Sequence, residues 1–587
     1  MCGIIGYKGE REVAPILLDG LRKLEYRGYD SAGMAVSNGK IFLKKDVGKI
    51  EETHSKINFL DLKGRMGIAH TRWATHGGVT KENAHPHLSN NRKIALVHNG
   101  IIENYQELKK FLISKNFSFY SQTDTEVIPN LIEYFMRNES FENAVKMALE
   151  KLEGSYAIVV FNENEDKLIA ARKDSPLVIG IGENEYFVAS DIPAFLEHTK
   201  NVIFLDEKDV AIIGDELKIF NLKEKSFVNR PLKTVEWKLE QIKKGDFEHF
   251  MLKEITEQAE TINRAIEQDE STIKKVAELM KEAKGIYLVG CGSSYHACLS
   301  ASYKFSSIAK MHVNVALASE FSNFKDFIVP ETLVIAVSQS GETADVLEAI
   351  RSAKERGAKI ISIVNVLGSS LTRESHKALM MNSGPEICVL STKTYTSQIT
   401  ILILLAYALA GRYEEGKRKL KDLINYVYHL TSENARNYIK RLAEKLKNKD
   451  HIYIIGRNFQ YPTALEAALK IKEVSYIHAE GFAGGELKHG TIALIEKGTP
   501  CIVFTSEKIE KEILSNAMEL KSRGAFIIGI GPKNNELFDF FIKVRESEEA
   551  NSICQIIPIQ ILAYQLAILR GCDPDKPKNL AKSVTVK

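Results

Sequence analysis

The chain has 587 residues, of which 44% are hydrophobic and 26% are charged, so its composition is that of a globular protein long enough for several domains. Its 79 basic and 76 acidic side chains nearly balance, and this charge predicts neither a nucleic-acid nor a membrane-surface partner. The seven cysteines include no C-x-x-C pair, which argues against a zinc site or a disulfide framework and favours a reducing cytoplasm.

Neither a signal peptide nor a membrane span is expected. Charged residues such as Lys8 and Glu10 interrupt the N-terminus before any apolar segment of useful length. The most apolar run, Ile399 to Ala410, is shorter than the roughly 20 residues that cross a bilayer. We therefore interpret this run as a buried helix.

The chain begins Met1-Cys2-Gly3, and a small residue at position 2 favours removal of the initiator methionine. Cys2 would then carry both a thiol and an α-amine. Such an amine titrates at about 7.7 to 8.0, so near neutral pH it can take the thiol proton. The alternative is that Cys2 is an ordinary small residue that opens a strand.

From Cys2 to about Trp237, short alternating apolar segments predict antiparallel sheet with two helices, Ile16–Leu24 and Tyr105–Lys115, in an α+β domain. The expected strands include Ala32–Val36 and Lys40–Leu43 around the turn Asn38-Gly39, and Tyr156–Phe161 followed by Lys167–Ala171.

Five of the fifteen histidines lie between positions 70 and 98, so a metal site must be considered. There is no H-E-x-x-H helix and no acidic partner at ligand spacing, and we expect no metal. After the predicted strand Ile94–Val97 comes Asn99-Gly100. This pair is either a tight turn or a pair of amide donors for an oxyanion.

Five motifs of this region resemble, in order, the glutaminase domain of class II glutamine amidotransferases. They are MCGIIGY, LEYRGYDSAG, HTRWATHG, HNGIIEN and TDTE, beginning at Met1, Leu24, His70, His98 and Thr123. The resemblance implies an N-terminal nucleophile αββα sandwich in which Cys2 attacks the glutamine γ-amide and its α-amine is the base.

The same resemblance assigns the other glutaminase residues. Asn99 and the backbone N–H of Gly100 would form the oxyanion hole. Arg72 would hold the glutamine α-carboxylate and Asp124 its ammonium, as suits charge-assisted hydrogen bonds. His76 would line the pocket.

The segment that begins at Lys238 is charged and helix-prone, and it is predicted to be an ordered helical connector. Beyond it the chain repeats itself. Ile286–Gly290 (IYLVG) recurs as Ile452–Gly456 (IYIIG), and Arg356–Ile361 recurs at nearly the same offset as Arg523–Ile528. Two copies of one domain are therefore expected, each with buried strands alternating with helices around a parallel sheet.

Hydroxyl-rich loops follow two strands of the first copy, Cys291–Ser294 and Ser338–Thr343, and each leads into a helix. A helix N-terminus and hydroxyl donors favour a phosphate dianion, although helix capping by Ser and Thr explains such loops equally well. Neither loop fits the G-x-x-x-x-G-K-[ST] pattern of a nucleoside-triphosphate site.

The second copy differs in its polar residues. Glu466, Lys470 and Glu473 lie at i, i+4 and i+7 of a predicted helix and so share one face, which is either a solvated ion-pair row or a site. A glycine-rich loop, GGELKHG, contains His489. The polar tail favours mobility, but Ser583–Val586 favours an extended, ordered segment that would hold Lys582 in place.

These segments resemble the isomerase half of the glutamine–fructose-6-phosphate aminotransferase family, whose repeats are sugar isomerase (SIS) domains. The motifs are GCGSSYHA, SQSGET, STKTYTSQ, the Tyr461–Glu473 helix, GELKHG and NLAKSVTV. Small departures from the family pattern are Ser293, Thr491-Ile492, Gln258-Ala259 and the terminal Lys587. The resemblance implies that fructose 6-phosphate is bound by Ser293, Ser294, Ser338, Gln339, Ser340, Thr343, Ser391 and Lys470.

The resemblance also implies the chemistry. His489, reaching into a neighbouring subunit of a homodimer, would open the sugar ring, and Lys582 would form a Schiff base at C2. Glu473 would move a proton between C2 and C1, assisted by Glu466 and Lys470, with no cofactor. Trp73 would gate a channel that carries ammonia between the two sites.

The implied domains are a glutaminase domain at 2–237, a connector at 238–270, SIS domains at 271–430 and 431–572, and a tail at 573–587 that closes the sugar site. Several other functions compete with this one. A phosphosugar-sensing regulator would need a basic helix-turn-helix, asparagine synthetase an S-G-G-x-D-S loop, and phosphoribosyl transfer an acidic pyrophosphate loop, and the sequence shows none of these. A SIS aminotransferase or deaminase that acts on another phosphosugar is the closest rival.

Overall fold

A computed structural model describes residues 2–237 and 239–585. The expectations for Met1, Lys238, Val586 and Lys587, including removal of the initiator, therefore lie outside the described residues. The chain forms two compact units. The first contains the chain up to Ile242 together with residues from Ala581 onward, and the second contains Lys243–Leu580.

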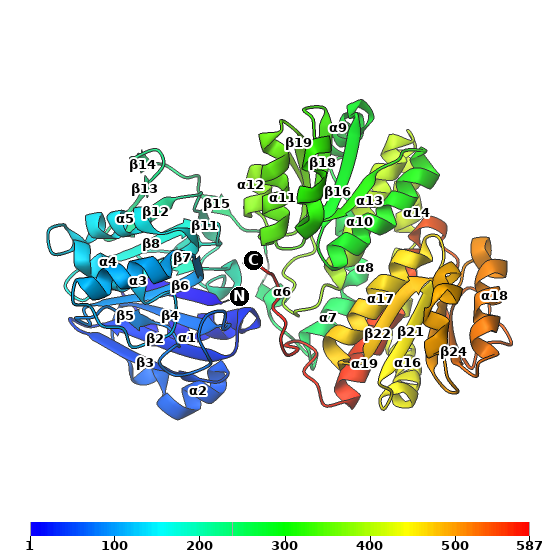
Figure 1. Ribbon diagram of the computed structural model, residues 1–587, viewed down its shortest axis with the longest axis horizontal. Helices are drawn as coiled ribbons and strands as arrows, with labels where there is room; N and C mark the ends of the chain where they lie inside the picture. The colour runs from blue at the N-terminus through cyan, green and yellow to red at the C-terminus, as the bar shows by residue number, and fades with distance from the viewer. Residues whose placement is uncertain (1, 238, 586–587) are drawn as a thin grey trace. The chain divides into compact units, whose positions relative to one another are not determined.

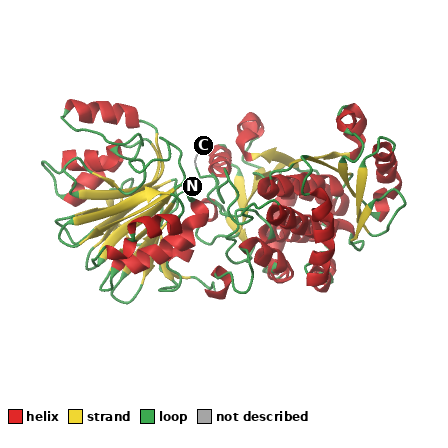
Figure 2. Ribbon diagram, turned by 90° about the horizontal axis from the view of Figure 1, so that it is seen from below, coloured by secondary structure: helices red, strands yellow, loops and turns green. Residues whose placement is uncertain are grey.

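The first unit contains two antiparallel sheets stacked between helices (Figures 1 and 2). An eight-stranded sheet has the order β15-β11-β9-β10-β1-β4-β2-β3, and a seven-stranded sheet has the order β14-β13-β12-β8-β7-β6-β5. The strands are β1 (Gly3–Lys8), β2 (Ser31–Ser37), β3 (Ile41–Val47), β4 (Met66–Arg72), β5 (His87–Leu88), β6 (Ile94–Ile102), β7 (Gly154–Asn162), β8 (Leu168–Lys173), β9 (Val178–Ile181), β10 (Tyr186–Ala189), β11 (Asn201–Phe204), β12 (Asp209–Ile213), β13 (Leu217–Asn221), β14 (Ser226–Val228) and β15 (Lys233–Thr234).

Apolar side chains from the facing sides of both sheets form one core, to which β1 contributes Ile4, β4 contributes Ile68 and β6 contributes Val97. The opposite face of the second sheet packs on helices α3 (Tyr105–Ser114), α4 (Val127–Phe135) and α5 (Phe141–Lys151). Helix α1 (Val13–Leu24) covers the outer face of β1 and β4. These layers form the αββα sandwich that the motifs predict.

Both predicted hairpins are confirmed, β2 with β3 around Asn38-Gly39 and β7 with β8. The prediction of only two helices in this unit is wrong, because α2 (Ile50–Ile57), α4 and α5 are also present. Strand β6 continues through Asn99 and Gly100 to Ile102, opposite β7. The tight-turn interpretation of Asn99-Gly100 is therefore wrong, and these two residues lie inside the sheet.

The second unit contains two parallel five-stranded sheets, which confirms the internal repeat (Figure 1). Their orders are β17-β16-β18-β19-β20 and β22-β21-β23-β24-β25, the same topology twice. The strands are β16 (Gly285–Gly290), β17 (Asn314–Leu317), β18 (Thr332–Ser338), β19 (Lys359–Val364), β20 (Lys377–Met380), β21 (His451–Gly456), β22 (His478–Ala483), β23 (Pro500–Phe504), β24 (Phe526–Gly531) and β25 (Phe540–Lys543).

Helices surround both sheets and connect them. They are α6 (Leu239–Ile242, in the first unit), α7 (Phe250–Thr256), α8 (Gln258–Ile266), α9 (Glu270–Glu282), α10 (Ser293–Lys304), α11 (Ala344–Glu355), α12 (Ser370–Glu374), α13 (Lys393–Leu409), α14 (Tyr413–Lys421), α15 (Ile424–Leu430), α16 (Glu433–Leu446), α17 (Gln460–Ser475), α18 (Glu510–Lys521) and α19 (Asn551–Leu569). The segment predicted as a helical connector is thus largely helical.

Two apolar helices lie at the centre of the second unit. Every residue of α13 is buried, which confirms the interpretation of the Ile399–Ala410 run as a core helix. The segment Glu548–Leu569, which contains α19, is long and apolar enough to cross a membrane, but 83% of its most apolar window is buried inside the structure. That burial is typical of a core helix.

Candidate active sites

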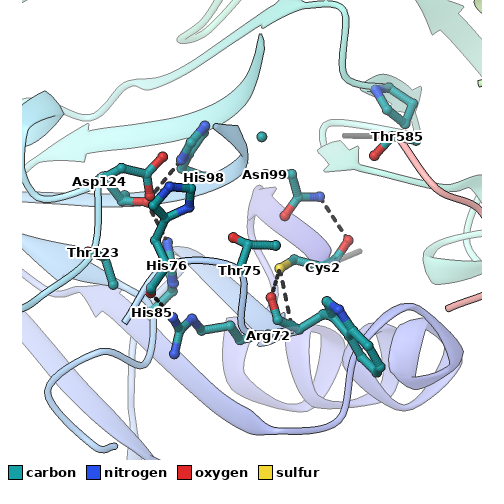
Figure 3. A pocket seen from close by; sticks show the side chains of 14 residues that line it. Cys2, Arg72, Thr75, His76, His85, His98, Asn99, Thr123, Asp124 and Thr585 are labelled. Atoms are coloured by element: carbon teal, nitrogen blue, oxygen red, sulfur yellow. Dashed lines mark hydrogen bonds between the residues drawn. The ribbon is translucent and has the colours of Figure 1, made fainter. Parts of the chain in front are cut away.

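One pocket of the first unit brings together all seven residues that the sequence assigns to glutamine hydrolysis (Figure 3). Its lining consists of Cys2, Arg72, Trp73, Thr75, His76, His85, His98, Asn99, Gly100, Thr123, Asp124, Thr125, Pro176 and Thr585. The residues come from β4, β6 and the chain before β1, among other segments. These strands meet in the facing sheets, so segments far apart in sequence converge on one thiol.

The Cys2 thiol lies at the start of β1. The backbone N–H of Trp73 donates to Cys2 Sγ over 3.2 Å, and Trp73 stands edge-on to Tyr29 with ring centroids 5.6 Å apart. Burial raises the pKa of the Cys2 thiol, although the Trp73 hydrogen bond and the charge of Arg72 act in the opposite direction. The thiol is therefore protonated at neutral pH and needs a base to become a nucleophile.

The two residues predicted to form the oxyanion hole, Asn99 and Gly100, line the same pocket as this thiol. Asn99 Nδ2 donates to the Cys2 carbonyl oxygen over 2.8 Å (Figure 3). Gly100 has φ +133, and a Cβ at this position would lie 2.1 Å from the Ser155 carbonyl oxygen. Only glycine fits this backbone beside the pocket.

Two buried charged groups line the opposite part of the pocket. Arg72 donates to the carbonyl oxygens of His76, Gly77 and Gly78, and burial lowers the pKa of its guanidinium. Asp124 Oδ2 accepts from the backbone N–H of Ile102 over 2.7 Å. An arginine and an aspartate held by backbone groups can receive the carboxylate and the ammonium of an amino acid.

Four histidines of the predicted cluster lie buried at or behind the pocket. Burial lowers the pKa of His70 to about 3, and it also lowers the pKa values of His85, His87 and His98, so the four rings are neutral at pH 7. Among the described residues, no group of three or more His, Cys, Asp or Glu side chains is arranged to hold a metal. The cluster packs and hydrogen-bonds within the sandwich.

Six of the eight predicted sugar-site residues lie in the second unit at or just after the carboxyl ends of β16 and β18, whereas Ser391 precedes α13 and Lys470 lies on α17. These strands are neighbours in one parallel sheet, so the loops after them share an edge. Ser293 and Ser294 begin α10, and Gln398 donates to Ser294 Oγ over 3.1 Å. Ser338 Oγ accepts from the backbone N–H of Gly341 over 3.0 Å.

The remaining loop residues keep their hydroxyls close to one another. Thr343 Oγ1 lies 3.2 Å from Ser338 Oγ, and Ser340 Oγ accepts from the backbone N–H of Glu342. Ser391 Oγ lies 2.8 Å from Thr394 Oγ1. Gln339 lies half-buried between Ser338 and Ser340.

The charged row on α17 consists of Glu466, Lys470 and Glu473. It is buried, so its interpretation as a solvated ion-pair row is wrong. The side chains of Glu466 and Lys470 are 0% exposed, and that of Glu473 is 19% exposed. Lys470 Nζ lies 3.4 Å from Glu466 Oε1 and 2.7 Å from Glu473 Oε2. It also donates to Ser293 Oγ over 3.0 Å, which joins the two SIS copies.

Charge balance explains how this row tolerates burial. Burial alone would lower the pKa of Lys470, but the carboxylates of Glu466 and Glu473 outweigh it and raise that pKa. His296, on α10, lies with Nδ1 2.8 Å from Glu466 Oε2. Sequence reasoning missed His296, although it stands within the GCGSSYHA motif.

Two other expected residues stand outside α17 in the sequence. His489 is exposed at the end of the 3-10 helix η6 (Gly484–His489). Lys582 is half-buried in a terminal segment that clusters with the first unit, and residues 581–585 have no regular secondary structure. Thr585 of this segment lines the Cys2 pocket and was also missed. The roles of His489 and Lys582 stay predictions.

The fold and these sites define a class II glutamine amidotransferase domain followed by two sugar isomerase domains. The glutamine amidotransferase domain family matches residues 70–197, and the SIS domain family matches residues 279–408 and 445–570. The relatives include proteins named glutamine–fructose-6-phosphate aminotransferase (isomerizing) from Pyrococcus horikoshii and Thermococcus kodakarensis. Each is 47% identical, with 100% of both chains covered. The chain belongs to this family.

A solved structure supports the fold of the second unit. It is titled the C-terminal domain of glucosamine-fructose-6-phosphate aminotransferase from Francisella tularensis and is 33% identical, with a TM-score of 0.52. The match covers 57% of this chain and 99% of that chain. It agrees with the two parallel sheets described above.

Proposed function

We propose that this enzyme converts D-fructose 6-phosphate and L-glutamine to D-glucosamine 6-phosphate and L-glutamate, the first committed step of amino-sugar synthesis. The observation that carries the proposal is the convergence of all seven predicted glutaminase residues on one pocket, in a chain whose full-length relatives carry that activity in their names. No cofactor is needed, because ketose and aldose differ only by the position of protons and electrons within one skeleton.

In the first unit, the Cys2 thiolate attacks the glutamine γ-amide after its own α-amine takes the proton. Asn99 and the Gly100 N–H receive the oxyanion of the tetrahedral intermediate, which is where preorganised donors contribute most. Arg72 and Asp124 hold the two charged groups of the amino acid. Their backbone contacts support these roles, because they leave few alternative positions for either side chain.

In the second unit, the loops at the ends of β16 and β18 bind the sugar phosphate. The N-terminus of α10 and the hydroxyls of Ser293, Ser338 and Thr343 suit a dianion. Lys582, whose terminal segment clusters with the first unit, is proposed to form the Schiff base at C2. Glu473, in the second unit, transfers the proton between C2 and C1. The 2.7 Å contact with Lys470 supports this role, since it holds the Glu473 carboxylate in one place.

Glutamine hydrolysis and amino-sugar formation can be joined only if ammonia passes from the first reaction to the second, and we propose Trp73 as the gate for it. The proposed sugar site also needs a second subunit. Ammonia released to water would be protonated and lost as a nucleophile. We infer a homodimer in which His489 serves the neighbouring subunit's sugar site, and its exposure at the end of η6 is consistent with this. A cytoplasmic location is inferred from the metabolic substrates.

The deciding experiment is formation of glucosamine 6-phosphate from glutamine and fructose 6-phosphate, followed by mass spectrometry. A SIS enzyme for another phosphosugar would show little turnover with fructose 6-phosphate and clear turnover with a different ketose or aldose phosphate. A regulator would bind the phosphosugar and release no amino sugar. Only product formation with both substrates supports the proposal.

A further inference from the structure

His70 is a buried histidine that contacts the oxyanion residue without lining the pocket. It lies on β4, two residues before Arg72, and is 0% exposed. Its Nε2 atom lies 3.1 Å from Asn99 Oδ1 and 3.1 Å from the His98 carbonyl oxygen. The reaction described above gives this ring no role.

The partners of Nε2 determine which nitrogen carries the proton. A backbone carbonyl can only accept, so the nitrogen facing the His98 oxygen must be a donor. His70 Nδ1 is buried and has no hydrogen-bond partner among the described residues, which suits a nitrogen without a proton. The ring is therefore the neutral Nε2–H tautomer, with one hydrogen shared between two oxygens.

This tautomer determines the orientation of the Asn99 amide. With Oδ1 toward His70, the amide nitrogen faces the Cys2 carbonyl oxygen and donates to it over 2.8 Å. The reversed amide would place two donors together at His70 and two acceptors together at Cys2. Because an amide nitrogen has two hydrogens, one can remain on the Cys2 carbonyl while the other faces the reacting carbon's oxygen.

We propose that His70 is a positioning residue for glutamine hydrolysis: its Nε2–H holds the Asn99 amide with the nitrogen toward the nucleophile, ready to donate to the oxyanion. The inference rests on the proposed oxyanion role of Asn99. The ring is 0% exposed, so water is not expected to replace its N–H at Asn99 Oδ1, and His70 adds to the orienting effect of the Cys2 carbonyl oxygen. His85, stacked on His70 with centroids 4.2 Å apart, limits rotation of the ring.

The size of the effect follows from the donor that His70 controls. Loss of one oxyanion donor lowers kcat by about 10²- to 10³-fold in a well-studied protease. Without His70 the amide can still reach the productive orientation part of the time. We therefore expect His70→Leu to lower kcat for glutamine hydrolysis by about 10- to 100-fold, with KM changed by less than about 3-fold because Arg72 and Asp124 still bind the substrate.

The full-length enzyme is assayed for glutamate release with fructose 6-phosphate present. His70→Gln restores an N–H donor near the Nε2 position and should recover most of the lost kcat. His198→Leu is a matched control, since His198 stacks on Phe187 in the same unit outside the pocket. Amino-sugar formation from added ammonium should stay unchanged in every variant. An unchanged kcat in His70→Leu overturns the proposal.

A double-mutant cycle separates positioning from general structural damage. In the Asn99→Ala background, His70→Leu should lower kcat by less than about 2-fold, because the group it positions is gone. If His70→Leu lowers kcat as much in the Asn99→Ala background as in the wild-type background, His70 acts on another group, and the proposal is contradicted. If Asn99→Ala alone leaves kcat unchanged, the oxyanion assignment fails, and the role of His70 fails with it.

The tautomer can be tested spectroscopically on the wild-type enzyme, with one variant used only to assign the signal. In full-length enzyme with ¹⁵N-labelled histidine, correlation spectra of the His70 ring, assigned by comparison with His70→Gln, should show a proton on Nε2 only. They should stay unchanged between pH 6 and 8. A proton on Nδ1, or on both nitrogens, would reverse the hydrogen-bond assignment and overturn the proposal.

Discussion

The amine of Lys470 lies 2.7 Å from a carboxylate oxygen of Glu473, and the lysine side chain is entirely buried. Glu466 contacts the same amine from one turn earlier on α17. The proposed proton-transfer residue is thus held by a cation that has no access to water. His296 Nδ1 lies 2.8 Å from the other carboxylate oxygen of Glu466.

Removing the central cation should destabilise the second unit. Lys470→Met leaves two buried or half-buried carboxylates without their partner, and we expect the free energy of unfolding to fall by about 3–5 kcal/mol, as for other broken buried ion pairs. Urea unfolding measures it. Lys274→Met is the matched control, because Lys274 forms an exposed i,i+4 pair with Glu270 and its loss should change stability little. If Lys470→Met and Lys274→Met lowered the free energy of unfolding equally, the row on α17 would behave as a solvated one, against this account.

Acidification should weaken the same row through Glu466. Burial tends to raise the pKa of this carboxyl, but Lys470 and His296 outweigh it and lower the pKa below its ordinary value of 4.5. A group with a lowered folded-state pKa stabilises the fold above its unfolded pKa and loses this contribution as pH falls through the folded value. The wild type should therefore lose stability below about pH 4.5. In Glu466→Gln the free energy of unfolding should fall less steeply with decreasing pH than in the wild type. Identical pH dependence in the two proteins would contradict the charge balance.

Gly100 should be intolerant of a side chain. In Gly100→Ala the alanine would have to adopt the φ of +133, which is strained for a residue with a Cβ. The new Cβ would also lie 2.1 Å from the Ser155 carbonyl oxygen. Strain and overpacking together should lower the free energy of unfolding by about 2–5 kcal/mol. They should also displace the N–H proposed to bind the oxyanion, and glutamine hydrolysis should be lost. Gly39→Ala is the control, since Gly39 has φ +72 with open space around it and should lose only about 1–2 kcal/mol. Equal unfolding midpoints for Gly100→Ala and Gly39→Ala would refute the prediction that Gly100 tolerates no side chain.

Lys582→Ala should separate sugar binding from chemistry. The phosphate contacts proposed for Ser293, Ser338 and Thr343 do not involve this amine, so binding of fructose 6-phosphate, measured by calorimetry, should change by less than about 10-fold. Without a Schiff base no amino sugar should form, from glutamine or from ammonium. Trapping with borohydride should label the wild type and not the variant. Normal product rates in the variant would exclude the Schiff-base role.

The sequence predicted the composition of the glutamine pocket better than its surroundings. The motif HTRWATHG holds Arg72 at the end of β4 and Trp73 and His76 in the segment just after it, so these residues stay close together. His70 and Thr585 could not be recognised, because their importance depends on contacts with residues far away in the chain. His98 had a weak signal, since it directly precedes Asn99.

Burial was the other quantity that local spacing could not supply. The i, i+4, i+7 pattern of Glu466, Lys470 and Glu473 predicts a shared face, and the same pattern occurs on exposed helices. That face is covered by α10, a helix from the other SIS copy. Likewise the strand through Asn99-Gly100 continues because β7 pairs with it, whereas the dipeptide alone favours a turn.

The central claim is that Cys2 releases nitrogen that the sugar site captures, and isotope transfer tests it most directly. The enzyme is given amide-¹⁵N glutamine, unlabelled ammonium and fructose 6-phosphate, and the glucosamine 6-phosphate is examined by mass spectrometry. The wild type should form mainly ¹⁵N-labelled product, while Cys2→Ala should form unlabelled product at a rate set by ammonium alone. Labelled product from Cys2→Ala, or none from the wild type, would contradict the account.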